Sequence, residues 1–157
     1  MQDLSFSFPT PHFCFGGFEF SVMIYTFRNV YAPDEKKMHI TENESGIMAV
    51  GNGFRWAGGQ METDGMVEIK ACVCDNGIRI KATAEIRNEG EDIRCIKITI
   101  HGLPEGKLVN LINALPREIP KEGLNLKYPE GWRDVGTPLV IMETDRKELL
   151  YFRSLDH

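Results

Sequence analysis

The 157-residue sequence lacks the features that would place it at once in several large classes of proteins. It has no run of about 18 uninterrupted apolar residues, the length that a membrane-spanning helix requires. Its N-terminus carries Asp3 where a signal peptide has basic residues, and Pro9 and Pro11 break the apolar run. It contains neither a phosphate-binding Gly-x-x-x-x-Gly-Lys-Ser/Thr motif nor a Gly-x-Ser-x-Gly nucleophile motif. The sequence therefore predicts no membrane span, no secretory signal and no common nucleotide or serine-hydrolase site.

Metal-ligand patterns and positive charge are also scarce. The four cysteines, Cys14, Cys72, Cys74 and Cys95, include no Cys-x-x-Cys, and the four histidines show no close metal-ligand spacing. We expect reduced thiols in a cytoplasmic protein, with no metal and no cofactor; the alternative is a zinc site built from Cys72, Cys74, Cys95 and a histidine. The net charge of −5 argues against nucleic acid or an anionic membrane as the main partner.

The residues that are present have the composition of an ordinary globular domain. Apolar residues make up 42% and charged residues 26% of the chain, which excludes a disordered protein. A chain of this length buries roughly 70% of its unfolded surface, so it folds without disulfides or metal. We expect residues 1–157 to form a single domain. Because 149–155 reads like a strand still in progress, we interpret the chain as a fragment of a longer protein; the alternative is a short native protein whose last strand is paired.

Hydrophobic residues recur with a period of two in the middle of the sequence. Apolar and polar residues alternate over 67–73 and again over 78–86, which is typical of half-buried strands. Three small residues, Ala71, Ala82 and Ala84, leave a shallow trough on the predicted buried face. Because protein interiors pack densely, we expect the phenylalanine-rich N-terminal region to fill it.

The Asn-Gly pair at 76–77 predicts a two-residue hairpin loop between these two strands. In the resulting register Val67 faces Ile86 and every pair on the core side is apolar. A slip by one residue would turn one strand's apolar side chains outward. The same register places Glu68 opposite Glu85, two like charges for which the sequence offers no reason.

Strand signals continue through most of the chain. Further strands are expected at 18–27, 36–41, 46–50, 96–101, 139–144 and 149–152. One segment, 108–115, fits a short helix limited by Pro104 and Pro116, and a strand at 107–111 is the alternative. Roughly nine or ten strands at regular spacing predict an all-β fold, an antiparallel two-sheet β-sandwich with at most one short helix.

A long segment without periodicity, 115–138, is the first candidate for a binding loop, because loops this long are either functional or wrongly assigned. It carries Tyr128, Trp132 and Arg133, and Trp56 lies in a separate glycine-rich stretch. Aromatic rings stack on the apolar face of a sugar, and arginine donates paired hydrogen bonds. These four residues are therefore candidates for carbohydrate binding; the alternative is that the aromatic rings plug the ends of the sandwich.

Candidates for catalysis are weaker. Glu62 and Asp64 are two residues apart, as are Glu143 and Asp145, and on a strand each pair would point to one side. Glycoside cleavage requires two carboxyl groups, but exposed acids at strand ends are common. We interpret these acids as solvated turn residues and His101 as a surface residue at a strand end, and we assign no catalytic residue.

Three stretches of the sequence resemble a known family. The first runs from Ile93 to Pro104 and ends in His-Gly-Leu-Pro, the second is Leu-Lys-Tyr-Pro-Glu-Gly-Trp at 126–132, and the third is Tyr-Phe-Arg-Ser-Leu-Asp at 151–156. Together they resemble the N-terminal β-sandwich domain of large bacterial proteins related to glycoside hydrolases, in which the sandwich precedes a (β/α)₈ barrel. The wider fold group is that of the galactose mutarotase-like supersandwiches.

This resemblance implies a non-catalytic accessory domain that packs on the catalytic domain of the same parent chain and contacts carbohydrate. It transfers no catalytic residue, because in that architecture the acid and the nucleophile come from the barrel. Two alternatives of other classes stay open. One is a free-standing, epimerase-like sugar enzyme with an acid–base pair near His39 or His101, and the other is a protein-interaction module that binds through an edge strand.

The candidate binding loop gives a first prediction. Trp132→Ala should weaken the retention of oligosaccharides without lowering the melting temperature, because an exposed stacking platform contributes to binding and not to the core. Affinity electrophoresis and thermal melting of both proteins measure the two effects. A fall of several degrees in melting temperature would make Trp132 a core residue and remove it from the binding site.

Overall fold

A computed structural model of the chain describes residues 10–56, 61–74, 77–109, 117–118 and 139–153. The chain divides into two compact units, Met1–Gly102 and Leu103–His157. In both units the described elements are almost all antiparallel strands, so the predicted all-β sandwich class is confirmed. The only helical element among these residues is one 3₁₀ turn, η1 (Glu35–Lys37), and no helix there is long and apolar enough to cross a membrane.

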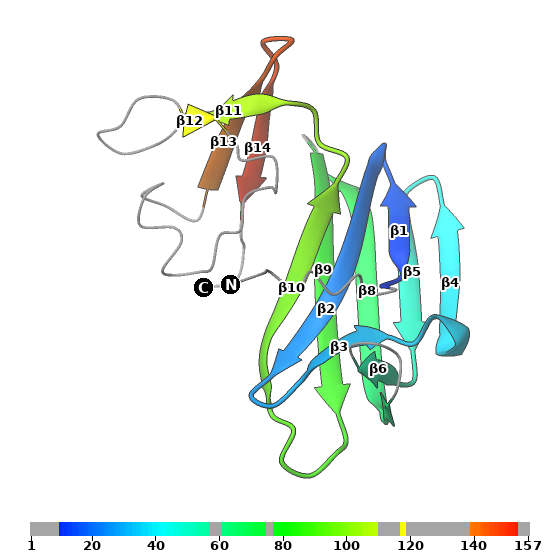
Figure 1. Ribbon diagram of the computed structural model, residues 1–157. Coiled ribbons are helices and arrows are strands. Elements are labelled where there is room, and N and C mark those ends of the chain that lie inside the picture. Colours follow the sequence, from blue (N-terminus) through cyan, green and yellow to red (C-terminus); the bar gives the residue numbers. More distant parts are fainter. Residues whose placement is uncertain (1–9, 57–60, 75–76, 110–116, 119–138, 154–157) are drawn as a thin grey trace. The chain divides into compact units, whose positions relative to one another are not determined.

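The first unit contains two sheets that face each other (Figure 1). Sheet A is formed by β1 (His12–Phe15), β2 (Phe18–Thr26), β3 (Val30–Pro33), β6 (Phe54–Trp56) and β7 (Glu62–Thr63), in that order, with β10 (Ile93–His101) paired to β2. Sheet B is formed by β4 (Met38–Asn43), β5 (Gly46–Gly51), β8 (Gly65–Cys74) and β9 (Gly77–Ile86). The strand expected from residue 36 begins at Met38, because the Asp34 side chain accepts a hydrogen bond from the Lys36 amide and caps η1.

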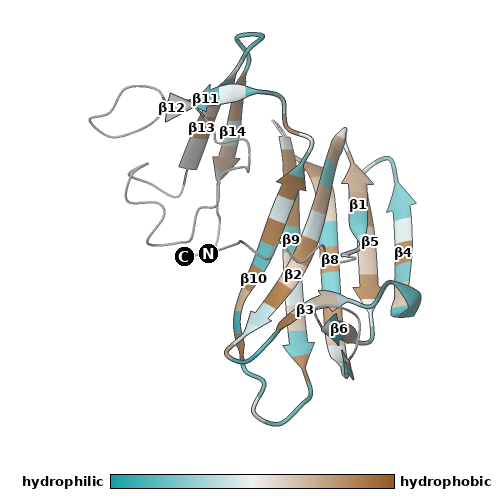
Figure 2. Cartoon of the chain, viewed as in Figure 1, coloured by the Kyte–Doolittle hydropathy of each residue, from teal (hydrophilic) through white to brown (hydrophobic). Residues whose placement is uncertain are grey.

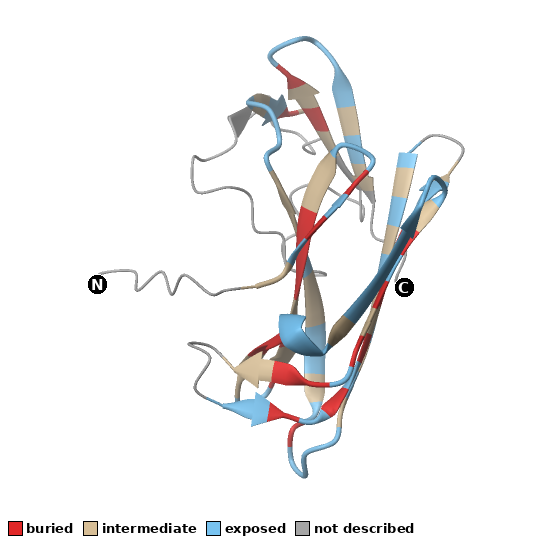
Figure 3. Cartoon of the chain, turned by 90° about the vertical axis from the view of Figure 1, so that its right-hand side faces the viewer, coloured by how far each residue is buried: buried red, intermediate tan, exposed pale blue. Residues whose placement is uncertain are grey.

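The core lies between the inward faces of these two sheets, where buried residues occur along the strands (Figure 3). Hydrophobic and hydrophilic residues alternate along the second part of β10, from Ile96 to His101, as a half-buried strand requires (Figure 2). Phe13, Phe15 and Phe20 belong to the same core cluster as Ala71, and Ala82 and Ala84 pack against it. The expectation that N-terminal phenylalanines fill the space left by small residues is therefore confirmed.

The β8–β9 hairpin forms between the predicted strands, but the predicted register is wrong by two residues. Val67 faces Ala84, and Cys74 pairs with Gly77, so the glycine belongs to β9. A shift of two residues keeps every side chain on its own face, and for that reason hydrophobic alternation does not detect it. The true register also removes the pairing of Glu68 with a like charge, since Glu68 lies opposite Thr83.

Two residues predicted on the buried face are exposed. Val73 is 60% exposed although it alternates in phase with Val67, which is only 1% exposed. Val73 is paired with Ile78, one rung before the Cys74–Gly77 pair that ends the hairpin. Ile98 of β10 is 37% exposed, and the structure offers no explanation for this exposure.

The second unit contains one antiparallel sheet. Its strands are β11 (Gly106–Leu108), β12 (Arg117–Glu118), β13 (Leu139–Thr144) and β14 (Leu149–Arg153), in the order β12-β11-β13-β14. Leu108 and Met142 are buried in it. Leu108 ends a strand and does not begin a helix, and the rest of the expected helix, 110–116, lies outside the described residues. The predictions of a single domain and of a longer parent chain stay predictions.

The packing of the hairpin gives a matched pair of tests. A Cβ atom at Gly65 would collide with the Glu85 carbonyl oxygen and the Phe54 ring, whereas a Cβ at Gly77 would meet open space. Gly65→Ala should therefore destabilise the fold by about 1–3 kcal/mol, and Gly77→Ala should be nearly neutral. Urea unfolding of both variants measures this, and equal losses would show that the described β8–β9 packing is wrong.

Candidate functional site

A polar pocket of about 300 Å³ opens where three segments of the first unit meet. Lys37 of η1 forms one wall, and Glu62, Thr63 and Asp64 on and after β7 form the second. The third wall consists of the two residues that follow β9, Arg87 and Asn88. These residues lie far apart in the sequence and come from both sheets and from the turn between them. We call this cavity the β7 pocket.

Behind the β7 pocket, four side chains form a closed ring of alternating charge, here called the charge ring. Lys37 Nζ lies 2.8 Å from Glu62 Oε2 and 3.7 Å from Asp34 Oδ2. Arg55 closes the ring, with Nε 3.5 Å from Asp34 Oδ1 and Nη2 3.8 Å from Glu62 Oε1. The Lys37–Glu62 contact is also a hydrogen bond, and it is therefore the tightest link.

Local structure positions each member of the ring. Asp34 is buried at the N-terminus of η1, where its carbonyl oxygen accepts a hydrogen bond from the Lys37 amide at 2.9 Å. Arg55 and Glu62 are direct partners in the β6–β7 ladder, and cross-strand partners lie close enough for their side chains to interact. Asp34 therefore has two cations within reach, as a buried carboxylate requires.

The ring fixes the protonation state of its exposed acid. The hydrogen bond and the charge of Lys37 hold the pKa of Glu62 below its ordinary value. The same hydrogen bond from the other side raises the pKa of Lys37. At neutral pH Glu62 is consequently a carboxylate and Lys37 an ammonium group, and Glu62 has no proton to donate to a leaving group.

The remaining lining residues leave polar groups available. Within the described ranges, neither the Asp64 carboxylate nor the Asn88 amide makes a side-chain hydrogen bond or an ion pair. The Arg87 amide donates to the Asp64 carbonyl oxygen at 3.0 Å, and this bond joins two walls of the pocket. The lining carries two positive side chains, Lys37 and Arg87, and two negative ones, Glu62 and Asp64, so its charge is balanced.

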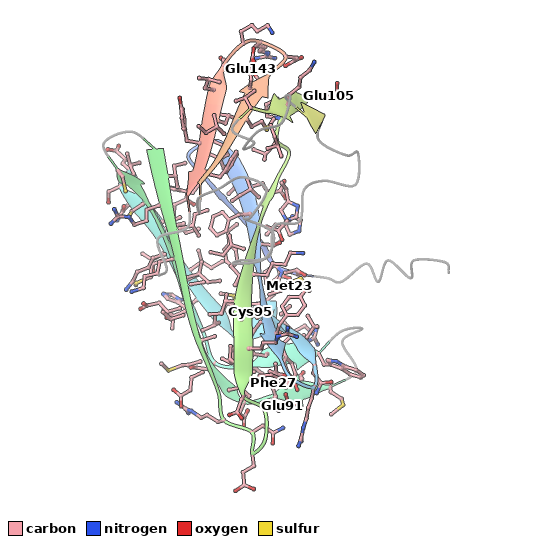
Figure 4. The ribbon with its side chains drawn as sticks, turned by 90° about the vertical axis from the view of Figure 1, so that its left-hand side faces the viewer. Met23, Phe27, Glu91, Cys95, Glu105 and Glu143 are labelled. Atoms are coloured by element: carbon pink, nitrogen blue, oxygen red, sulfur yellow. The ribbon has the colours of Figure 1, made fainter. Side chains whose placement is uncertain are left out.

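A buried carboxylate fixes the loop that follows β9. Glu91 Oε1 accepts hydrogen bonds from Asn29 Nδ2 at 2.6 Å and from the Tyr31 hydroxyl at 3.1 Å. Its amide donates to the Asn88 carbonyl oxygen at 3.2 Å. Figure 4 shows Glu91 close to Phe27, at the turn between β2 and β3. Glu91 therefore connects the loop that carries Asn88 to the neighbouring hairpin.

The surroundings of Glu91 favour its charged form. The Thr26 hydroxyl, and after it Asn29 and Tyr31, lower the pKa of this carboxyl against the opposing effect of burial. Burial, in turn, raises the pKa of Tyr31, and the neighbouring Glu91 acts in the same direction. The phenol is thus a neutral hydrogen-bond donor and the carboxylate is its charged acceptor.

A second polar cluster lies on the outer face of sheet A. The Ser21 hydroxyl and His101 Nε2 are 2.8 Å apart, and the His101 ring stacks on His12 with centroids 4.5 Å apart. His12 Nδ1 contacts the Glu19 carboxylate. Because the acid contacts His12 and not His101, this is not the Ser-His-acid relay of a nucleophilic site. His39, the other histidine near which the epimerase alternative places its acid–base pair, lies on β4 of sheet B.

The sequence did not predict the β7 pocket, because Glu62 and Asp64 were interpreted as solvated turn residues and not as part of a site. Spacing predicted that Glu62 and Asp64 point to one side, and both line the pocket. It missed Lys37, Arg87 and Asn88, because no motif connects these positions and their neighbourhood arises only from the fold. The other acidic pair belongs to the second unit, where Glu143 forms an ion pair with Lys147 at 2.9 Å.

The four predicted carbohydrate-binding residues have different outcomes. Trp56 lies on β6, opposite Tyr31, where it is half-buried and packs against the core cluster. It is not among the residues that line the β7 pocket. Tyr128, Trp132 and Arg133 lie outside the described residues. The carbohydrate-binding role of all four stays a prediction.

The cysteines give no support to the zinc alternative. All four are free thiols, and Cys72 on β8 lies in a different sheet from Cys95 on β10. In the described part of the chain, no three His, Cys, Asp or Glu residues are placed to hold a metal ion.

Comparison of the chain with protein-family models, with curated proteins and with solved structures finds no match. The functional interpretation therefore depends on the geometry of the described residues and on the sequence resemblance.

The Glu91 contacts predict a pH-dependent stability. Because the pKa is lower in the folded chain, the charge stabilises the fold above the unfolded pKa of about 4.3, and this contribution is lost as pH falls through the folded value. Glu91→Gln should cost about 1 kcal/mol at pH 7, and the difference from wild type should shrink as the pH falls below about 4.3. Urea unfolding across this range measures it.

Glu89→Gln, in the same loop but exposed, is the control and should show no such pH-dependent difference. A constant gap between wild type and Glu91→Gln from pH 7 to pH 3 would contradict the assigned ionisation.

Proposed function

We propose that this chain is a non-catalytic β-sandwich module that accompanies a glycoside hydrolase, packs on the catalytic domain of the same parent chain and contacts carbohydrate. The observation that carries this proposal is the β7 pocket, an open polar site whose best-placed carboxylate is held ionised by Lys37. The antiparallel sandwich and the sequence resemblance support the kind of module. The free cysteines support the cytoplasmic location.

The state of Glu62 does not suit the acid role in glycoside cleavage. Hydrolysis of a glycosidic bond needs one protonated and one ionised carboxyl group, and enzymes obtain the protonated one by raising its pKa. Lys37 has the opposite effect on Glu62. Glu62 is therefore suited to accept hydrogen bonds from hydroxyl groups and not to act as the general acid.

A second candidate function is protein binding through an edge strand, and one observation favours it. β4 is an end strand of sheet B and pairs with β5 on one side. Ile40 on this strand is 50% exposed. An edge strand with an exposed apolar side chain can pair with a strand of another chain. A stable dimer that Ile40→Lys dissociates would support this candidate over carbohydrate binding.

The main proposal is tested on the 157-residue chain with soluble neutral gluco-, xylo-, manno- and galacto-oligosaccharides. We expect saturable binding of at least one of them by isothermal titration calorimetry, and no release of new reducing ends after long incubation. A boiled sample controls for non-specific heat. Release of reducing ends would show an enzyme, and the absence of binding across the whole series would overturn the carbohydrate role.

A further inference from the structure

We infer that the β7 pocket binds the hydroxyl groups of one neutral sugar residue and selects it against acidic and amino sugars, an inference that rests on the proposed function. Nothing in the sequence assigns this site, since the residues predicted to bind carbohydrate lie elsewhere or outside the described ranges. The pocket volume of about 300 Å³ is at the lower end of small-molecule sites and suits a single ring.

Charge balance determines the class of ligand. Lys37 and Glu62 neutralise each other across 2.8 Å, and the buried Asp34 supports Lys37 from behind. A uronate would place a third carboxylate beside Glu62 and Asp64, and an amino sugar would place an ammonium group beside Lys37. A neutral hydroxyl group, in contrast, accepts from an ammonium and donates to a carboxylate without disturbing the balance.

The arrangement of donors and acceptors fits adjacent hydroxyl groups. Lys37 Nζ and Glu62 Oε2 present a donor and an acceptor side by side. On the other walls, the Asp64 carboxylate and the Asn88 amide have no side-chain partner in the described part of the chain, so their hydrogen-bonding capacity is open to a ligand. An amide both donates and accepts hydrogen bonds, whereas a carboxylate only accepts them. A hydroxyl group beside Asp64 must therefore donate, and one beside Asn88 can donate or accept.

The walls are fixed before any ligand arrives. The Arg87 amide is bonded to the Asp64 carbonyl oxygen, and the buried Glu91 carboxylate holds the loop that carries Asn88. The charge ring holds Lys37 and Glu62 in place. A pocket built in advance loses little conformational freedom on binding, which allows a few hydrogen bonds to give measurable affinity.

The experiment compares wild type with Asn88→Ala, Asp64→Asn and Glu62→Gln, using the neutral oligosaccharide that the wild-type chain binds best. Each of the first two variants should weaken binding about tenfold, because each weakens or removes one hydrogen bond to the ligand. Glu62→Gln leaves an excess of positive charge, so it should weaken neutral binding and strengthen binding of an oligogalacturonate. An oligogalacturonate and a chitosan oligomer are the charged comparators for wild type.

The controls match each change outside the pocket. Glu68→Gln is the control for Glu62→Gln, because Glu68 is also an acid paired with a lysine, at 2.9 Å from Lys70 Nζ, although it is half-buried. Asp145→Asn is the control for Asp64→Asn, since Asp145 is exposed in the second unit. Thermal melting shows whether each variant folds. Amide NMR shifts of the wild-type chain on titration, expected at Lys37, Thr63 and Asn88, test the site without any variant.

Each outcome is decisive. If the wild-type chain binds a neutral oligosaccharide but neither the shifts nor the affinities implicate the pocket, the inference is wrong and the proposed function stands. If a charged comparator binds wild type more tightly than every neutral one, the site exists but its ligand class is wrong. If no oligosaccharide binds, the proposed function fails and this inference fails with it.

Discussion

The buried carboxylate of Asp34 is the constraint on which the β7 pocket depends. A charge removed from water needs partners, and Asp34 finds Lys37 and Arg55. Both cations also lie near Glu62, so their charges hold this exposed acid at one place on the pocket wall. Asp34 caps η1 as well, and that turn determines where Lys37 lies. One residue therefore links a local backbone turn to the position and ionisation of a pocket side chain.

The alternation of apolar and polar residues predicts which face of a strand is buried better than it predicts which residues pair across neighbouring strands. It correctly turned Val67 inward, yet it did not distinguish Ala84 from Ile86 as the residue opposite, because a two-residue shift leaves both faces unchanged. The turn chemistry was the only local signal for register, and the structure assigns the glycine of the Asn-Gly pair to the strand. Val73 shows a second limit, since alternation gives the side of a residue but not how far it is buried.

The pocket was harder to predict than the fold for a related reason. The buried face of a strand can be predicted from residues two positions apart in the sequence. The pocket instead brings together residues that are distant in the sequence: Lys37 and Glu62 are 25 positions apart, and Asn88 follows later still. The one local signal was the two-residue spacing of Glu62 and Asp64, and the expectation that they share a side agrees with their place in the pocket. The β8–β9 pairing brings Asp64 to the end of β9, because Asp64 and Arg87 stand one rung beyond the Gly65–Ile86 pair, but the two-residue error in the predicted register misplaces this partner.

Two buried carboxylates, Asp34 and Glu91, each hold a wall of the pocket, and both do so by collecting donors from neighbouring segments. The pocket therefore needs no ligand charge to complete it. The contacts of Glu62 within the charge ring also determine its protonation state. A carboxylate that Lys37 keeps ionised is a dependable acceptor for a hydroxyl group, but it has lost the raised pKa that a proton donor requires.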